Sequence, residues 1–204
     1  MNSKPDICID FASASNNYRR LHGGGRGQAI AKAVGLKTYG LPLVIIDATA
    51  GLGQDSFVLA CLGCNVTMCE RSPIIAALLA DALSRATANL EINAIVSRMQ
   101  LIHGDAIQIL SNLTPAQYPD VVYLDPMFPT RNKTALVKKE MRFLKTTVGD
   151  DLDADQLLEL ARKVAKKRVV VKRSRTAGFL NNTSPHCSQI GKANRFDIYM
   201  PTTV

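Results

Sequence analysis

Short apolar runs alternate with longer helical stretches, and this alternation restricts the fold more than any other feature of the sequence. The apolar runs are LVIID (43–47), NVTMCER (65–71), DVVYLDP (120–126) and RVVVKRS (168–174). Their residues are apolar on both faces of the expected strands, as in parallel sheets that are covered on both sides. The sequence therefore predicts an α/β fold with a mostly parallel sheet and helices on both faces.

The stretches between the apolar runs have helical spacing. Residues 72–90 form a long expected helix with Ser72 as its N-cap and Pro73 at its first position. Residues 153–167 carry acids in the first turn and bases in the last, as the helix dipole favours. The other expected elements are helices over 28–35, 56–63 and 106–113, strands over 99–106 and 195–201, and a polar loop over 177–192.

The overall composition fits one globular domain. The 204 residues, 47% of them hydrophobic, can build one core, so we expect a single domain over 1–204 with residues 1–40 as an N-terminal lead-in. No apolar stretch approaches the roughly 18 residues of a membrane span, and the N-terminus lacks a signal core, which predicts a soluble cytoplasmic protein without membrane partners. The CLGC sequence (61–64) has no second cysteine pair, so we expect neither a disulfide framework nor a metal.

Acidic residues end four successive expected strands. Asp47, Glu70, Asp105 and Asp125 each follow a run of β-favouring residues. One such acid is commonplace, because aspartate often begins a turn. Four in chain order predict a ligand site, since parallel strands present their carboxyl ends at one edge of the sheet.

A glycine-containing turn follows the first of these strands. Gly51 and Gly53 allow backbone N–H groups to approach a ligand closely, with Asp55 beside them, and Glu70 has the spacing of an acid that binds a ribose diol. The dinucleotide pattern is incomplete because Ser56 stands at its third glycine, and no P-loop is present. S-adenosylmethionine fits this arrangement, its methionine end near Asp47 and the loop. A nicotinamide-dependent oxidoreductase remains an alternative.

The fourth strand runs into DPMF (125–128), which is similar to the D/N-P-P-Y/F pattern of enzymes that methylate an exocyclic amino group of a base. We expect Asp125, with the carbonyl of Pro126, to accept hydrogen bonds from the amine and to orient its lone pair. Phe128 would stack on a base swung out of its helix. The alternative is a strand that ends at proline, with the aspartate capping a turn and the phenylalanine in the core.

The net charge of +8 lies in one segment. Residues 131–175 hold 14 basic and 6 acidic residues, which predicts a surface that binds a polyanion such as RNA, with a solvated helix face as the alternative. HGGGRG (22–27) resembles the oxyanion loop of lipases, but the chain has no G-x-S-x-G elbow. Two interpretations stay open: its N–H groups and Arg26 bind a phosphate or the cofactor carboxylate, or the stretch is a flexible loop before a helix. The predicted RNA contacts are Arg26, Lys133, Lys138, Lys139, Arg142, Lys172 and Arg173.

The joint presence of HGGGRG, DATAGLGQDSFVLA and YLDPMFP resembles the bacterial ribosomal small subunit methyltransferase J family over nearly the whole chain from Ile9. The resemblance implies a Rossmann-like class I methyltransferase fold, S-adenosylmethionine as the donor, and N2-methylation of one guanosine in 16S ribosomal RNA, free or in the small ribosomal subunit. The cofactor contacts that it implies are Gln54, Asp55, Glu70, Arg71, Asp105, Ala106 and Asp125.

This sequence departs from the family pattern in two places. Family members usually have several dozen more residues before the segment IDFASASNNYRR (9–20), and Gln54 stands where an arginine is common. The residues alone do not distinguish adenine N6, cytosine N4 and guanine N2 as targets, and guanine comes only from the resemblance. An RNA-binding module without catalysis is the other open alternative.

Overall fold

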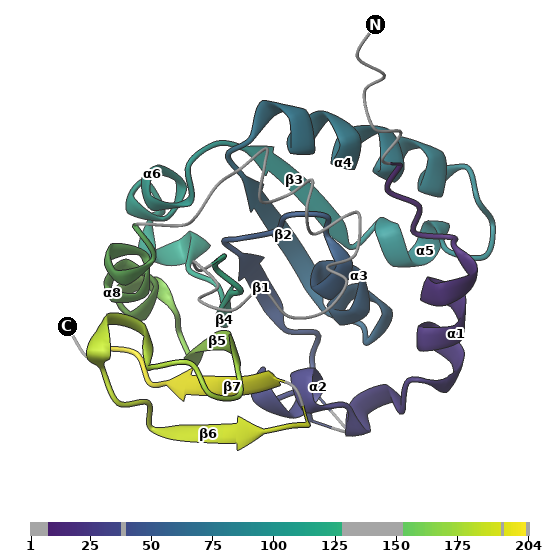
Figure 1. Cartoon of the computed structure of the whole chain (residues 1–204). Helices are drawn as coiled ribbons and strands as arrows, with labels where there is room; N and C mark the ends of the chain where they lie inside the picture. Colours follow the sequence, from purple (N-terminus) through teal and green to yellow (C-terminus); the bar gives the residue numbers. More distant parts are fainter. Residues whose placement is uncertain (1–7, 38–39, 128–152, 193, 203–204) are drawn as a thin grey trace, which may run out of the picture.

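Seven strands form one sheet in the computed structural model, which describes residues 8–37, 40–127, 153–192 and 194–202 (Figure 1). The strands are β1 (Val44–Asp47), β2 (Asn65–Glu70), β3 (Met99–His103), β4 (Val121–Leu124), β5 (Arg168–Ser174), β6 (Cys187–Ile190) and β7 (Asn194–Tyr199). Their order across the sheet is β3-β2-β1-β4-β5-β7-β6. The first five run parallel, and β7 is antiparallel to both β5 and β6.

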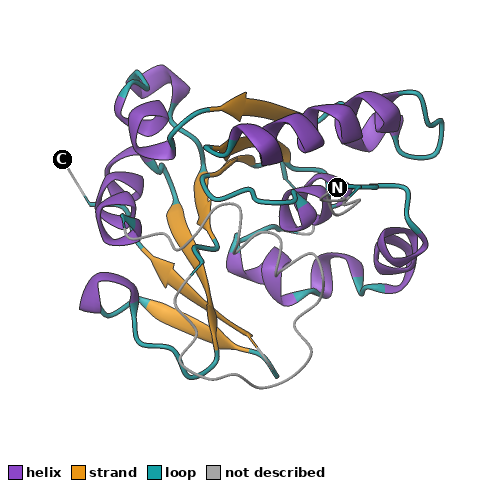
Figure 2. Ribbon diagram, turned by 45° about the horizontal axis from the view of Figure 1, so that its top comes forward, coloured by secondary structure: helices purple, strands orange, loops and turns teal. Residues whose placement is uncertain are grey.

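Helices cover both faces of the sheet (Figure 2). The α-helices are α1 (Ala14–His22), α2 (Ala29–Ala33), α3 (Gln54–Cys61), α4 (Pro73–Thr87), α5 (Asn93–Val96), α6 (Ala106–Ser111) and α8 (Ala154–Val164), and the 3-10 helices are η1 (Gly25–Gly27), η2 (Pro115–Gln117) and η3 (Leu180–Asn182). Residues of α2, α3 and α4 pack in one apolar core, and residues of α6 and α8 pack in a second.

Successive side chains of each strand point to opposite faces of the sheet, so the strands contribute to both cores. Ile45 and Tyr123 point to the core of α3 and α4, whereas Ile46 and Val122, their neighbours in sequence, point to the core of α6 and α8. All four are buried. The expected two-faced parallel sheet is therefore confirmed.

The structure corrects the expected loop over 177–192. Residues 180–182 form η3, and β6 (Cys187–Ile190) lies at the edge of the sheet, paired with β7. The sequence of β6, CSQI, has little β-favouring character, and its residues are exposed or half-buried. Residues 187–190 therefore form a strand because they pair with β7, and their own sequence pattern does not predict one.

A buried ion pair holds this edge together. The guanidinium of Arg195 donates from Nε and Nη2 to the two carboxylate oxygens of Asp197, at 2.8 and 2.9 Å, and both residues are buried on β7. The hydroxyl of Ser188 on β6 donates to Asp197 at 2.5 Å. Arg195 also donates to the carbonyls of Arg175 and Ala177, which fixes the chain after β5.

Replacing Asp197 with alanine should lower the free energy of unfolding by about 3–5 kcal/mol, because Arg195 would be left buried without its carboxylate. Urea unfolding followed by circular dichroism measures the change. Lys167→Met is the matched control, since Lys167 is 56% exposed in its pair with Asp120 and should cost no more than about 1 kcal/mol. An equal loss in the two variants would contradict the structural role of the buried pair.

Candidate active site

The carboxyl ends of β1, β2 and β4 meet at one edge of the sheet, as the parallel register requires. Asp47 pairs with Met68 of β2 and with Tyr123 of β4, so Glu70 and Asp125 follow two residues beyond these partners. The predicted acids thus come from neighbouring strands. Asp105 follows β3 on the far side of β2, and its N-terminal neighbour Gly104 donates to the carbonyl of Glu70 at 2.9 Å.

The loop between β1 and α3 depends on two glycines with left-handed backbone. Gly53 is the N-cap of α3 at φ +70°, and a Cβ there would lie 2.9 Å from Leu79 and 3.2 Å from Phe11. Gly51 has φ +53°, but a Cβ there would meet only the carbonyl oxygen of Thr49 at 4.0 Å. Core side chains therefore pack against the loop at Gly53, whereas the loop is open at Gly51. A ligand could lie against the backbone of the loop at Gly51.

Glu70 ties this loop to the next helix. Its Oε2 accepts from the N–H of Gly51 at 3.0 Å, and its Oε1 accepts from the N–H of Ser72, the N-cap of α4, at 2.7 Å. The residue is buried at the end of β2. These bonds hold the carboxylate beside the open part of the glycine loop.

Asp47 lies beneath the loop and is only 2% exposed. Its carboxylate accepts from the hydroxyl of Ser56 at 2.5 Å and from the N–H of Thr49 at 3.2 Å. Burial raises the pKa of Asp47 from 3.8 to about 7, against the lowering effect of these two hydrogen bonds. The side chain therefore braces the loop from inside.

Lys172 of β5 joins two carboxylates at the edge of the sheet where Glu70 ends its strand and Asp105 and Asp125 follow theirs, an edge that we call the acidic rim. Its ammonium donates to Asp55 Oδ2 and to Asp125 Oδ2, both at 2.7 Å. The hydroxyl of Tyr123 donates to the same oxygen of Asp55 at 2.7 Å. The backbone of Asp125 is fixed as well, because its N–H donates to Thr49 Oγ1 at 2.6 Å. The side chain of Asp125 remains 40% exposed, which leaves it accessible to a substrate.

The charges of this cluster stabilise one another. Burial disfavours the charged forms, but Lys172 holds the pKa of Asp55 below its ordinary value, and the two carboxylates raise the pKa of Lys172 above its own. Burial, followed by the nearby charge of Asp55, raises the pKa of Tyr123 well above 10. At neutral pH the cluster thus holds ionised Asp55, protonated Lys172 and a phenol that acts as a donor.

The other predicted cofactor residues lie at the same rim but differ in exposure. Asp105 caps α6, with Oδ1 accepting from the N–H groups of Ile107 and Gln108. Arg71 pairs with Asp153, with Nη1 within 3.2 Å of both carboxylate oxygens. Predicted cofactor residues that complete the set are Gln54, exposed at the first position of α3, and Ala106, half-buried at the first position of α6.

The predicted RNA-binding residues are only partly described. Lys172 lies in the ion cluster and is 22% exposed, so it is not part of an open basic surface. The guanidinium of Arg26 donates to the carbonyl of Lys37, and Arg173 donates to the carbonyl of Gly178 at 2.8 Å. Phe128, Lys133, Lys138, Lys139 and Arg142 lie outside the described residues.

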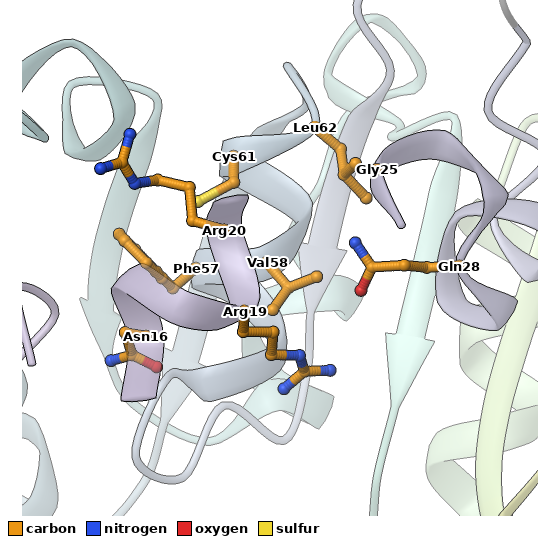
Figure 3. Close-up of a pocket in the computed structure, with 9 residues that line it drawn as sticks. All are labelled: Asn16, Arg19, Arg20, Gly25, Gln28, Phe57, Val58, Cys61 and Leu62. Atoms are coloured by element: carbon orange, nitrogen blue, oxygen red, sulfur yellow. The ribbon is translucent and has the colours of Figure 1, made fainter. Parts of the chain in front are cut away.

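A small pocket lies between α1, η1 and α3, and its lining residue Arg19 is 3.8 Å from Asp55 of the acidic cluster (Figure 3). Its volume of about 90 Å³ is far below the roughly 300–1,000 Å³ of sites that enclose small molecules. Val58 and Leu62 form part of its wall, and Arg19 and Arg20 leave α1 in different directions. This pocket is too small for a nucleoside donor, so the rim is the better candidate site.

Metal ligands and membrane spans are absent from the described parts of the chain. No group of three or more His, Cys, Asp or Glu side chains there could hold a metal ion, and burial raises the pKa of both Cys61 and Cys64 to about 11. Their thiols are therefore not poised as metal-binding thiolates. No helix among the same residues is long and apolar enough to cross a membrane.

Sequence reasoning missed two residues of the candidate site, Thr49 and Tyr123, and did not predict the partners of a third, Lys172. Thr49 accepts from the backbone of Asp125 and Tyr123 donates to Asp55, whereas Lys172 was predicted as an RNA contact and its hydrogen bonds to both aspartates were not foreseen. Lys172 lies 47 residues from Asp125, and only the pairing of β4 with β5 brings them together. The available signal was the place of Lys172 near the carboxyl end of an expected strand adjacent to the acidic rim.

Comparison with known proteins gives the family. Residues 1–201 match a family described as "Putative SAM-dependent methyltransferase". The chain is 57% identical to ribosomal RNA small subunit methyltransferase J of Aeromonas hydrophila, over 95% of this chain and 77% of that protein. It is 54% identical to the protein of the same name from Escherichia coli, over 97% of this chain and 78% of that one.

A solved structure agrees with these sequence matches. A SAM-dependent methyltransferase of Neisseria gonorrhoeae superposes with a TM-score of 0.79 at 41% identity, covering all of this chain and 78% of that one. An rRNA methyltransferase of Streptomyces viridochromogenes, at 14% identity and a TM-score of 0.53, shares the fold. With its parallel sheet, glycine loop and acidic rim, the chain belongs to the SAM-dependent methyltransferase family that includes ribosomal RNA small subunit methyltransferase J.

Proposed function

We propose that this protein transfers a methyl group from S-adenosylmethionine to N2 of a guanosine in 16S ribosomal RNA, in the cytoplasm. The observation that carries this proposal is the partly exposed carboxylate of Asp125, which accepts from Lys172 while the backbone N–H of the same residue donates to Thr49 of the loop after β1. The relatives named ribosomal RNA small subunit methyltransferase J support RNA of the small subunit as the substrate. Family membership favours this function over a nicotinamide-dependent oxidoreductase or a non-catalytic RNA-binding module.

The side chains and the loop backbone at the rim are suited to bind the methyl donor, S-adenosylmethionine. Glu70 would accept hydrogen bonds from the ribose hydroxyls, and Asp105 would accept one from the adenine amino group with the oxygen that does not cap α6. Gly51 leaves the loop backbone open to the methionine end, while Asp47 and Gly53 hold the loop in shape. Secondary donor contacts are proposed at Gln54, Asp55, Arg71 and Ala106, which lie at the same rim.

The target amine is a poor nucleophile because its lone pair is delocalised into the ring. When bound, S-adenosylmethionine supplies a methyl group on a positively charged sulfur. Asp125, with the carbonyl of Pro126, would accept hydrogen bonds from the amine, which localises its lone pair and directs it. Phe128 is proposed to stack on the extruded base. The amine proton lost after transfer would pass to Asp125 or to solvent.

Basic residues are proposed to hold the RNA backbone. Arg26 and Arg173 are within the described part of the chain, and the remaining predicted contacts are Lys133, Lys138, Lys139 and Arg142. Neutralising phosphates releases counterions, so RNA binding should weaken steeply as salt rises. Lys172 is given a different role below.

Replacing Glu70 with glutamine should raise the Kd for S-adenosylmethionine by about 10- to 100-fold, because charged hydrogen bonds to the ribose would be lost. Isothermal titration calorimetry measures the affinity. Glu91→Gln is the matched control, since Glu91 is 71% exposed and 4.0 Å from its partner Arg20. Wild-type affinity in the Glu70 variant would remove this residue from the donor site.

Replacing Asp125 with alanine should leave donor affinity near the wild-type value but reduce methyl transfer by about 100-fold or more, because the amine loses its acceptor. Transfer of labelled methyl groups to small-subunit RNA from cells lacking the protein measures the rate, and mass spectrometry locates the product. Asp81→Ala, at an exposed ion pair of α4, serves as the control. Undiminished transfer in the Asp125 variant would sink its assigned role.

The pH dependence of stability should report the buried carboxyl of Asp47. Its folded pKa of about 7 exceeds the unfolded value of about 3.9, so the folded state holds an extra proton between these pH values. Its contribution to the free energy of unfolding should therefore fall by about 1.4 kcal/mol per pH unit from about pH 4 to pH 7, and level off above. Urea unfolding of wild type and Asp47→Asn should give different slopes in this window. Parallel profiles would contradict the raised pKa.

A further inference from the structure

Lys172 has one more hydrogen-bond donor than the described residues use. An ammonium carries three N–H groups, and two of them point to Asp55 and Asp125 at 2.7 Å. Within the described parts of the chain, no third acceptor hydrogen-bonds to it. Its side chain is 22% exposed and lies at the rim where Asp125 is 40% exposed. A ligand that reaches Asp125 therefore meets a cationic donor directly beside the carboxylate.

The carboxylate of Asp125 and the ammonium of Lys172 form a row of hydrogen-bonding groups in a fixed order. A carboxylate such as that of Asp125 has acceptor lone pairs on both of its oxygens, and the nitrogen of Lys172 lies 2.7 Å from one of these oxygens. The row is held by paired strands, because Leu124 of β4 is in register with Val171 of β5. Thr49 fixes the backbone of Asp125, and Asp55 fixes the ammonium from its other side. The order presented to a base is acceptor, acceptor, donor.

This order matches one base only. The Watson–Crick edge of guanine presents the N2 amino donor, the N1–H donor and the O6 acceptor in a row. Adenine and cytosine also present an amino donor, but a ring nitrogen with a lone pair follows it, and this lone pair would face a carboxylate oxygen. Enzymes that extrude a base read it through hydrogen bonds to this edge. A site built from Asp125 and Lys172 would therefore favour guanine and repel the other two amino-bearing bases.

We propose that Lys172 is a specificity-determining residue that donates to O6 of the target guanine, while Asp125 accepts from its N2 and N1 groups. This inference rests on the proposed function and adds the residue that selects the base. It differs from a backbone phosphate contact, for which an ammonium held between two carboxylates is poorly suited. It also differs from simple neutralisation of Asp55 and Asp125, which would affect all target bases alike.

The test compares two substrates that differ in one atom. Synthetic fragments of small-subunit RNA would carry either guanosine or 6-thioguanosine at the methylated position, because sulfur is a weak acceptor while N1–H and the N2 amine are retained. We expect wild type to prefer guanosine by about tenfold in kcat/KM, corresponding to about 1.4 kcal/mol. In Lys172→Met this preference should fall towards one, since neither substrate then meets a donor.

The controls separate base reading from other roles. Lys167→Met removes an exposed lysine that directly precedes β5, and this variant should keep the wild-type preference. If the methionine variant fails to fold, Lys172→Gln retains a polar side chain and should still show a reduced preference. An unchanged preference in a folded Lys172 variant, whatever its rate, would overturn the inference. If wild type methylates no RNA of the small subunit, the proposed function itself fails, and the inference falls with it.

Discussion

Carboxylates converge at one edge of a parallel sheet, and the arrangement of the site follows from how their mutual repulsion is relieved. The negative charge of these acids is relieved in three different ways. The pKa of Asp47 is raised to about 7 by burial, so its carboxyl is only partly ionised near neutral pH. Glu70 accepts hydrogen bonds from the backbone N–H groups of Gly51 and Ser72. Asp55 and Asp125 share the ammonium of Lys172. Three mechanisms thus keep one crowded rim stable while part of it stays open to ligands.

The fold and the positions of the acids could be predicted because they depend on local patterns. Alternation of apolar runs with helical spacing predicts the parallel sheet, and an acid directly after each run is placed at the rim by topology alone. The partners of these acids could not be predicted this way. Lys172 stands in a strongly basic stretch, and its contact with Asp125 depends on which strands are neighbours. Strand β6 was missed for the same reason, since pairing with β7 makes it a strand.

Site residues that bind differ from those that support binding, and sequence patterns do not separate the two. Asp47 and Gly53 belong to the glycine motif, but both are buried and shape the loop from within. Gly51 is half-buried with only the carbonyl oxygen of Thr49 near its Cβ position, and the side chain of Asp125 is 40% exposed. A motif therefore predicts which loop to consider, whereas burial and hydrogen bonding indicate which of its members are accessible to a ligand.

Phe11 connects the entry of the described chain to the cofactor loop. Its ring stacks on Phe57 of α3 with centroids 5.1 Å apart, and it lies 3.2 Å from the position that a Cβ at Gly53 would occupy. The left-handed turn at Gly53 thus rests on an aromatic side chain from the segment before α1. Alterations upstream of the first helix, such as an affinity tag that displaces Phe11, should therefore change the affinity for S-adenosylmethionine through the packing of this turn.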